Sequence, residues 1–385
     1  MRPEILVVCP LYLDLVLEVD RPLTPRRPTA ETDADDPAGR GGLDHSVYEV
    51  ARISEPSDRL VVRNDAGETI EIVNTSAATL PVTGTIFVDQ PLVADEAWHQ
   101  RVGLTAHRQL PGGMGSGFAA ALKSHAVAAL GANHSRQPDA AGRKLIECLR
   151  EADVGLTPQL FSGVDTDTTV LVSSGPHGDK LPIGRRQVGS MLNCNAELKN
   201  AIDQTNVLVI AGLHNRLTAE LLSAPGAAGY VVFAPTWRNI DSANSVLGPV
   251  ADQIDYLCCN EEEWQGLDAD SWVRNRVALI TVTAGTKGAT VYFHNQAGQS
   301  TSLHVPAFRP GEPPVDTNRA GESFASAFLS CLLDEVELDA MKSGTFAHEL
   351  IEQAAREAAV AAHLQVQTSS FQFHDRDRIR AAMRQ

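Results

Sequence analysis

Residues 314–328 have the types and spacing that acid–base chemistry beside an anion would need. They read PVDTNRAGESFASAF, a polar segment that contains glycine and runs directly into an amphipathic helix. The first amides of a helix have no partners within it and carry partial positive charge, so they can bind an anion. The carboxylate of Glu322 could accept a proton from a hydroxyl group held nearby. A purely structural interpretation is also open, with Asn318 as the N-cap and Glu322 as a first-turn acid that the helix dipole favours.

Polar residues also follow two predicted strands further upstream. Asn260 and Glu263 come directly after the strand at 255–259, and their spacing places both on one face at a helix start. Thr283 and Gly285 follow a second strand, where the backbone could approach a nucleotide. The structural alternatives are a capped, acidic first turn for the first pair and a plain strand–turn for the second.

Asp14 and a glycine pair are the remaining candidates for contact with a small molecule. Asp14 lies in the apolar, β-branched segment 4–19, and a carboxylate in such surroundings needs a partner such as the hydroxyls of a sugar. Gly112 and Gly113 precede an Ala-rich stretch. The residues that follow also fit the dinucleotide pattern G-x-G-x-x-A, but 109–111 interrupt the tight strand that this pattern requires.

The elements that must position these residues alternate between helix and strand from about residue 105 onward. Near-continuous apolar strands separated by helices predict a parallel sheet covered on both faces. The predicted strands are 168–173, 206–211, 230–234, 277–283 and 290–294, and the predicted helices are 119–130, 140–152, 321–336 and 351–364. Residues 45–90 instead alternate between apolar and polar types, with a hairpin turn at 64–67, and predict a small sheet with one wet face.

Composition narrows the classes of function. The net charge is 32 − 48 = −16, which disfavours binding to nucleic acid or to anionic membranes. No apolar run approaches the roughly 18 residues that a membrane span needs. The six cysteines include no C-x-x-C pair, and most lie beside apolar runs, so we expect free buried thiols and a cytoplasmic protein.

Taken together and in this order, the segments resemble the ribokinase-like sugar kinases, the PfkB carbohydrate kinase family. Asp14 resembles the family's sugar-binding aspartate. The segments similar to family patterns are 112–119 (G-G-x-x-x-N-x-A), 233–238 (D-P-N-x-R), 260–263 (N-x-x-E), 283–288 (T-L-G-x-x-G) and 314–324 (D-T-x-G-A-G-D-x-F). The resemblance covers 1–20 and roughly 105–370.

The resemblance implies a three-layer α/β sandwich with a mostly parallel central sheet and a small β lid. It implies ATP- and Mg2+-dependent phosphorylation of a hydroxyl on a sugar or sugar-containing small molecule, a nucleoside being one option, and it leaves a monovalent-cation requirement open. The base for in-line attack on the γ-phosphate would be Glu322, assisted by Gly321, Ala320 and Arg319. By the same resemblance the acceptor would be held by Asp14, Gly112, Gly113 and Gly117, the nucleotide by Asn260, Thr283, Gly285, Gly288 and Asp316, and Mg2+ by Glu263 through water.

Several positions depart from the family pattern. The family's catalytic aspartate is Glu322 here, and one extra methylene moves an extended carboxylate by about 1.5 Å. A misplacement of about 1 Å can cost roughly 100-fold in rate. Arg319 replaces the first small residue of the anion site, and Gly117 replaces the asparagine that contacts sugar. These changes favour an alternative, a catalytically weakened or inactive ribokinase-fold protein that binds ligands or regulates a partner.

The resemblance also divides the chain. We expect residues 1–20 and 105–385 to form the nucleotide- and substrate-binding core, and 21–104 to form an enlarged β-rich lid. Lid sheets in this family often pair between subunits, so we expect a homodimer through the lid.

Overall fold

The structure, a computed structural model, describes residues 3–19, 47–52, 59–64, 69–74, 85–88, 99–173, 180–185, 187–223, 229–236, 239–240, 243–268, 272–309 and 311–384. The chain divides into two compact units. The first unit comprises Met1–Leu11, Pro111–Thr166 and Val188–Gln385, and the second comprises Tyr12–Leu110 and Asp167–Gln187.

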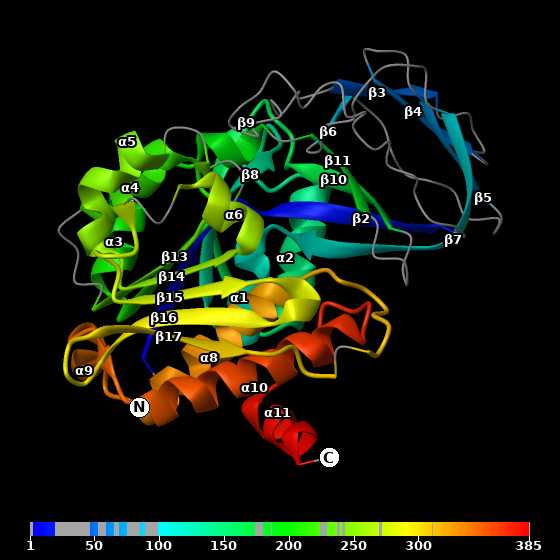
Figure 1. Ribbon diagram of the computed structural model, residues 1–385. Helices are drawn as coiled ribbons and strands as arrows, with labels where there is room; N and C mark the ends of the chain where they lie inside the picture. The colour runs from blue at the N-terminus through cyan, green and yellow to red at the C-terminus, as the bar shows by residue number, and fades with distance from the viewer. Residues whose placement is uncertain are drawn as a thin grey trace, which may run out of the picture. The chain divides into compact units, whose positions relative to one another are not determined.

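The first unit is built around one large sheet (Figure 1). In spatial order its strands are β17 (Ser300–Val305), β16 (Ala289–Asn295), β15 (Leu279–Thr283), β14 (Tyr256–Asn260), β13 (Tyr230–Ala234), β12 (Val207–Ala211), β1 (Ile5–Val8), β8 (His125–Ala132) and β9 (Gly155–Ser162). All neighbours from β9 to β15 pair in parallel, whereas β16 and β17 add antiparallel. The short β18 (Thr345–Phe346) pairs in parallel with β16.

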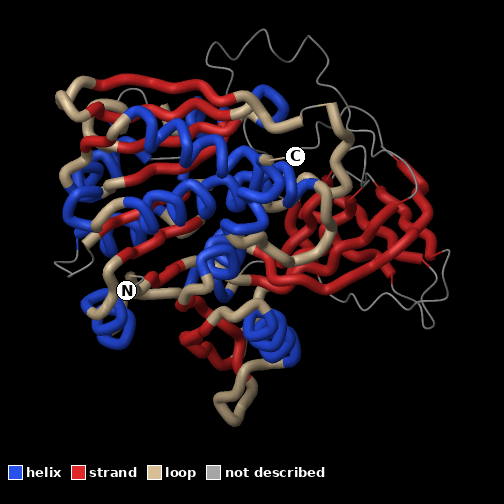
Figure 2. The backbone as a smooth tube through the Cα atoms, turned by 90° about the horizontal axis from the view of Figure 1, so that it is seen from below, coloured by secondary structure: helices blue, strands red, loops and turns tan. Residues whose placement is uncertain are grey.

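Helices cover both faces of this sheet because successive residues of each strand point to opposite sides. Val7 and Cys9 pack in a core with α1 (Met114–Leu122), α2 (Ala140–Glu151), α8 (Ala320–Glu335) and α10 (His348–Val366). Leu6 and Val8 pack on the other face with α3 (Ala196–Asp203), α4 (Asn215–Ser223), α5 (Ala243–Leu247) and α6 (Glu261–Gly266). Figure 2 looks onto the layer that contains α8 and α10, with the strands behind it. The predicted three-layer sandwich with a mostly parallel sheet is therefore confirmed.

One predicted helix is wrong in its second half. The Ala-rich stretch 119–130 was expected to be helical throughout, but α1 ends at Leu122 and β8 begins at His125. Alanine favours helix intrinsically. In β8 the small side chains instead let a strand pass through the interior, where all but its first residue are buried. Burial between β1 and β9 thus outweighs the local preference.

The second unit consists of strands. They are β2 (Tyr12–Val19), β3 (Val47–Arg52), β4 (Arg59–Asn64), β5 (Thr69–Asn74), β6 (Thr85–Val88), β7 (His99–Gly112), β10 (Thr168–Ser173) and β11 (Lys180–Arg185). They pair in the closed order β10-β11-β6-β3-β4-β5-β7-β2. The strands β4 and β5 on either side of the predicted hairpin turn pair antiparallel, while residues 65–67 of that turn lie outside the described residues. Within the described part of the chain, no helix is long and apolar enough to cross a bilayer.

The C-terminal helix α11 (Arg376–Met383) is attached to the first unit by a buried carboxylate. Glu357 on α10 is 2% exposed. Its Oε2 accepts from Nε of Arg376 at 2.6 Å, and its Oε1 accepts from Nε of Arg380 at 2.9 Å. Arg376 also pairs with Asp334 on α8 at 3.1 Å. Burial by itself raises the pKa of Glu357, but the hydrogen bonds from the two arginines outweigh it and lower the pKa overall.

Glu357→Gln should lower the free energy of unfolding by about 3 kcal/mol, because Arg376 and Arg380 lose a buried counter-charge. Since the pKa of Glu357 is depressed in the folded protein, its contribution is complete above its unfolded-state pKa, near 4.3, and is lost as the pH falls below that value. Urea unfolding at pH 7 and in acid measures both effects.

Glu352→Gln is the matched control on the same helix, because Glu352 pairs with Arg356 in solvent. Glu352→Gln should lower the free energy of unfolding by less than about 0.5 kcal/mol. Equal losses for the two variants would contradict the assigned role of Glu357.

Candidate functional site at the carboxyl edge of the sheet

The candidate site lies at the carboxyl ends of the parallel strands in the first unit. The strands β8 and β9 follow β1 along the chain and lie on one side of it in the sheet. The next strand of the sheet along the chain, β12, lies on the other side of β1. Such a reversal leaves a crevice beyond the carboxyl ends of the strands. The start of α1 lies at this edge, since a Cβ added to Gly115 would collide with the side chain of Cys9, just past β1.

The carboxylate of Glu322 lies against Gly117 of α1. A Cβ added to Gly117 would lie 2.7 Å from Oε2 of Glu322 and 3.0 Å from its Cδ. The half-buried side chain of Glu322 therefore occupies the space that any side chain at 117 would enter. Two departures from the family pattern, at 117 and at 322, are thus in direct contact and compensate each other sterically.

The start of α8 does not have Asn318 as its N-cap, which was the structural alternative drawn from the sequence. The N-cap is Arg319 and not Asn318, and it makes no side-chain capping bond. Asp316 is 4% exposed, and its Oδ1 accepts from the amide of Asn318 at 2.8 Å, which fixes the preceding turn. Ala320, Gly321 and Glu322 form the first helical turn, and a Cβ at Gly321 would meet nothing within 4 Å. The space beside the Cα of Gly321 is thus open.

Arg319 links three segments at this edge. Its backbone has φ 66°, a left-handed conformation that disfavours side chains other than glycine. Its Nη2 donates to the carbonyl of Pro111 at 2.9 Å, directly before Gly112 and Gly113. Its guanidinium also lies 5.1 Å from the ring centre of Phe371. The arginine therefore joins the start of α8 to the glycine segment that leads into α1.

The glycine segment is fixed from within the first turn of α1. Ser116 is 1% exposed, and both its amide and its Oγ donate to the carbonyl of Gly113, at 3.0 and 2.7 Å. These bonds hold Gly113 and the adjoining Gly112 against α1.

The two segments predicted to contact a nucleotide are neighbours in the sheet. Asn260 at the end of β14 is paired in register with Thr283 at the end of β15. Asn260 and Glu263 form a reciprocal capping box, with Glu263 N donating to Oδ1 at 2.7 Å and Asn260 N donating to Oε2 at 2.9 Å. Burial raises the pKa of Glu263 to about 7, against the lowering effect of the bond from Asn260.

The turn after Thr283 requires glycine. Gly285 and Gly288 bound a short 3-10 turn, and both have positive φ. A Cβ at Gly288 would collide with the carbonyl of Val305 on β17. The amide of Ala284 donates to the carbonyl of Gly288 at 2.7 Å and closes the turn.

Two sequence-predicted features remain, Asp14 and the D-P-N-x-R-like segment. Asp14 belongs to the second unit, where it is 7% exposed on β2 opposite Thr169 of β10. The D-P-N-x-R-like segment follows β13, but Trp237 and Arg238 lie outside the described residues.

The sequence prediction missed a buried pair of asparagines at the same edge. Asn239 is fully buried, and its side chain bonds the amide of Thr236, the carbonyl of Leu213 and the Oδ1 of Asn215. It thereby ties the loops after β12 and β13 together. An asparagine five residues beyond an apolar strand is the only signal that the sequence offered for this role.

The donor set at this edge fits a hard cation that keeps its water. Within the described residues, no cluster of three or more His, Cys, Asp or Glu side chains is placed to hold a metal ion. Asn260 is nevertheless paired in register with Thr283 and shares a capping box with Glu263, so all three oxygen-bearing residues lie at one edge of the sheet. Mg2+ typically takes one or two protein carboxylates, with water and substrate phosphates completing its shell.

Glu263→Gln should remove a pH dependence of folding stability. Because the pKa of Glu263 is raised in the folded protein, this carboxyl group contributes its full stability below its unfolded-state pKa, near 4.5. The contribution is lost as the pH rises through the folded-state pKa of about 7. Glutamine keeps the capping box but carries no charge. The variant should therefore match the wild type near pH 4.5 and exceed it at pH 8 by roughly 2–3 kcal/mol.

Urea unfolding across this pH range, in the presence of a chelator, provides the measurement. Glu262→Gln, an exposed neighbour on the same turn, is the control and should follow the wild-type profile. Superimposable profiles for Glu263→Gln and the wild type would rule out the assigned pKa.

Comparisons with known proteins agree with this geometry. Among solved structures, Arabidopsis thaliana ribokinase, complexed with ribose and ATP, is 17% identical, with a TM-score of 0.61 and 100% of both chains covered. Nucleoside kinase from Methanocaldococcus jannaschii is 14% identical, with a TM-score of 0.60, covering 100% of this chain and 99% of that one. A chain from E. coli solved with ATP and Mg2+ is 13% identical, with a TM-score of 0.58 and 99% of each chain covered.

These likenesses establish the fold. No curated protein matches the sequence. A family model described as pfkB family carbohydrate kinase matches residues 80–377. Because that match spans well over half of the chain and the resemblance seen in the sequence agrees with it, the protein belongs to the pfkB family of carbohydrate kinases.

Proposed function

We propose that the protein transfers the γ-phosphoryl group of ATP, with Mg2+, to a hydroxyl of a sugar or sugar-containing small molecule. The observation that carries the proposal is the position of Glu322 in the first turn of α8 and against Gly117. Family membership supports the reaction class. The ribose and ATP bound by the Arabidopsis protein, and the ATP and Mg2+ bound by the E. coli chain, support the substrate and the cofactor.

Glu322 acts as the general base in this proposal. An ordinary glutamate is ionised at neutral pH and can take the proton of an acceptor hydroxyl as that oxygen attacks phosphorus. The amides of Ala320, Gly321 and Glu322 face the developing negative charge, assisted by the helix dipole. Arg319 holds this turn through Pro111 and Phe371, so its first role is to position the amides.

The nucleotide is proposed to lie along the ends of β14 and β15. Asn260, Thr283 and the turn bounded by Gly285 and Gly288 would border it, with Asp316 fixing the approach to α8. Mg2+, when bound, neutralises charge on the phosphate oxygens. Asn260 and Glu263 would hold its water.

The sequence resemblance alone supports Asp14 as a proposed acceptor-binding residue, and it separately supports the segment Gly112–Gly113. Gly117 has no side-chain amide where the family pattern has asparagine, so it offers the acceptor no side-chain hydrogen bond and instead leaves room for Glu322. Residues 21–104 remain the proposed lid, which would exclude water from the reaction, and pairing of lids remains the proposed route to a homodimer.

A ligand-binding protein without phosphotransferase activity is the second candidate. The replacement of the family aspartate by Glu322, and the strained Arg319 at the helix start, favour it. The two candidates differ in one measurable product, because only an enzyme releases ADP in proportion to an acceptor.

Glu322→Gln should lower acceptor-dependent ADP release by 100-fold or more, in line with the roughly 10²–10⁴-fold contribution of general base catalysis. The measurement is a coupled ADP assay over a panel of sugars and nucleosides. Glu335→Gln, at the far end of the same helix, is the control and should keep the wild-type rate. Undiminished ADP release in Glu322→Gln would disprove the base, and no release with any acceptor would favour the binding protein.

The contact between 117 and 322 should appear as coupling between two substitutions. Gly117→Asn alone should destabilise the protein and abolish activity, because its side chain overlaps Glu322. The double variant Gly117→Asn, Glu322→Asp should regain stability relative to the single one, with a coupling energy of about 1–2 kcal/mol. Urea unfolding and the ADP assay together complete the cycle, and strictly additive effects would show that the two positions are independent.

A further inference from the structure

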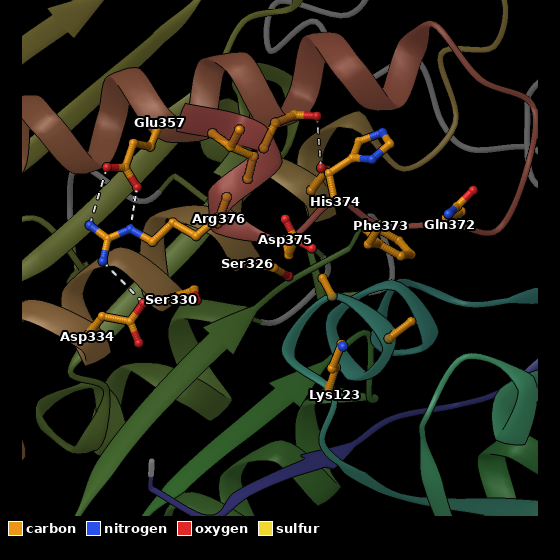
Figure 3. Close-up of a pocket in the computed structure, with 16 residues that line it drawn as sticks. Lys123, Ser326, Ser330, Asp334, Glu357, Gln372, Phe373, His374, Asp375 and Arg376 are labelled. Carbon is orange, nitrogen blue, oxygen red and sulfur yellow. Dashed lines mark hydrogen bonds and ion pairs between the residues drawn. The ribbon is translucent and has the colours of Figure 1, made fainter. Parts of the chain in front are cut away.

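A cavity of about 400 Å³ lies in the first unit (Figure 3). Its walls come from the C-terminal part of α1, from α8 and α10, and from residues 372–379 at the start of α11. None of the residues assigned above to the base, the helix amides, the nucleotide or the metal lines it. Its volume suits a small organic molecule.

A row of hydroxyls on α8 faces this cavity. Ser323, Ser326 and Ser330 recur at helical spacing, and all three line the wall. Ser323 Oγ donates to the carbonyl of Ala361 at 3.1 Å, so its hydrogen is already used. Ser326 is 1% exposed, and its Oγ has no hydrogen-bond partner among the described residues. A buried hydroxyl in this state costs about 1–3 kcal/mol, which a ligand hydroxyl could offset.

The charges around the cavity largely neutralise one another. Arg376 is held by Glu357 at 2.6 Å and by Asp334 at 3.1 Å, as the dashed lines of Figure 3 show. Lys123 and Asp375 then contribute one cation and one carboxylate at the rim. Burial lowers the pKa of the remaining titratable group, His374, with a further contribution from Arg378. A lining of two cations and three carboxylates disfavours an anionic ligand.

An aromatic ring completes the wall. Phe373 is half-buried and meets the ring of Phe371 edge-on, with ring centres 5.6 Å apart. Gln372 lies beside it and offers both a donor and an acceptor. An apolar ring face combined with donors and acceptors of hydrogen bonds, and without net positive charge, suits a ligand that carries hydroxyls on a carbon ring or chain.

We propose that this cavity is a second binding site, which takes a neutral polyhydroxylated molecule of the sugar or polyol class. Ser326 supplies the buried hydrogen-bonding group, Lys123 and Asp375 bind hydroxyls at the rim, and Phe373 packs against the carbon skeleton. The site does not depend on the proposed phosphoryl transfer, because it shares no residue with it.

Calorimetric titration of the full chain, without nucleotide, tests the proposal with glucose, ribose, sorbitol and myo-inositol as probes. At least one probe should bind the wild type, and Ser326→Ala should weaken that binding five- to tenfold, the loss expected for one hydrogen bond. Ser323→Ala is the matched control on the same helix. It should keep the affinity but lower Tm, since its hydroxyl bonds Ala361 and not the ligand.

The two serine variants also separate loss of binding from loss of folding. Ser326→Ala removes a hydroxyl without a partner, so its Tm should equal or exceed that of the wild type. Lys123→Gln, at an exposed position, gives a second variant that cannot disturb the core and should weaken the same probe. Identical titrations for the wild type and Ser326→Ala, or binding of inorganic phosphate in place of every neutral probe, would overturn the proposal.

Discussion

The carboxylate of Glu322 fits at the start of α8 because α1 presents no side chain at position 117. This close approach decides what either helix can carry at the point where they meet. A longer acid on α8 needs the space, and a glycine on α1 leaves it open. The departures at the two positions are therefore sterically compatible with each other.

The other contacts at this edge keep the same elements in place. Arg319 fastens the start of α8 to the carbonyl of Pro111, while Ser116 fastens Gly113 to α1. At the proposed nucleotide site, the register between β14 and β15 places Asn260 beside Thr283. Each contact uses backbone atoms on at least one side. The geometry of the site is thus set mainly by where helices and strands begin and end.

The sequence predicted the sandwich and the segments that gather at its carboxyl edge, because apolar strands and glycine turns are local signals. It predicted β13 to the residue and α8 to within one residue at each end. It failed where tertiary packing decides: β8 looks helical by composition but is buried as a strand. The N-cap at Arg319 and the buried pair of Asn215 and Asn239 were also missed, since both depend on contacts between distant segments. The roles of the individual site residues remain predictions.

The order of strands in the large sheet has a consequence for how the chain folds. The central strand β1 is far along the chain from both of its neighbours, since β1 ends at residue 8 whereas β8 and β12 begin at residues 125 and 207. All four residues of β1 are apolar and buried in the finished fold. During synthesis β1 is therefore made well before either partner, and its second edge can be paired only after β12 has been made. Contacts of such long range fold slowly, and an unpaired apolar strand is prone to aggregate in the interval.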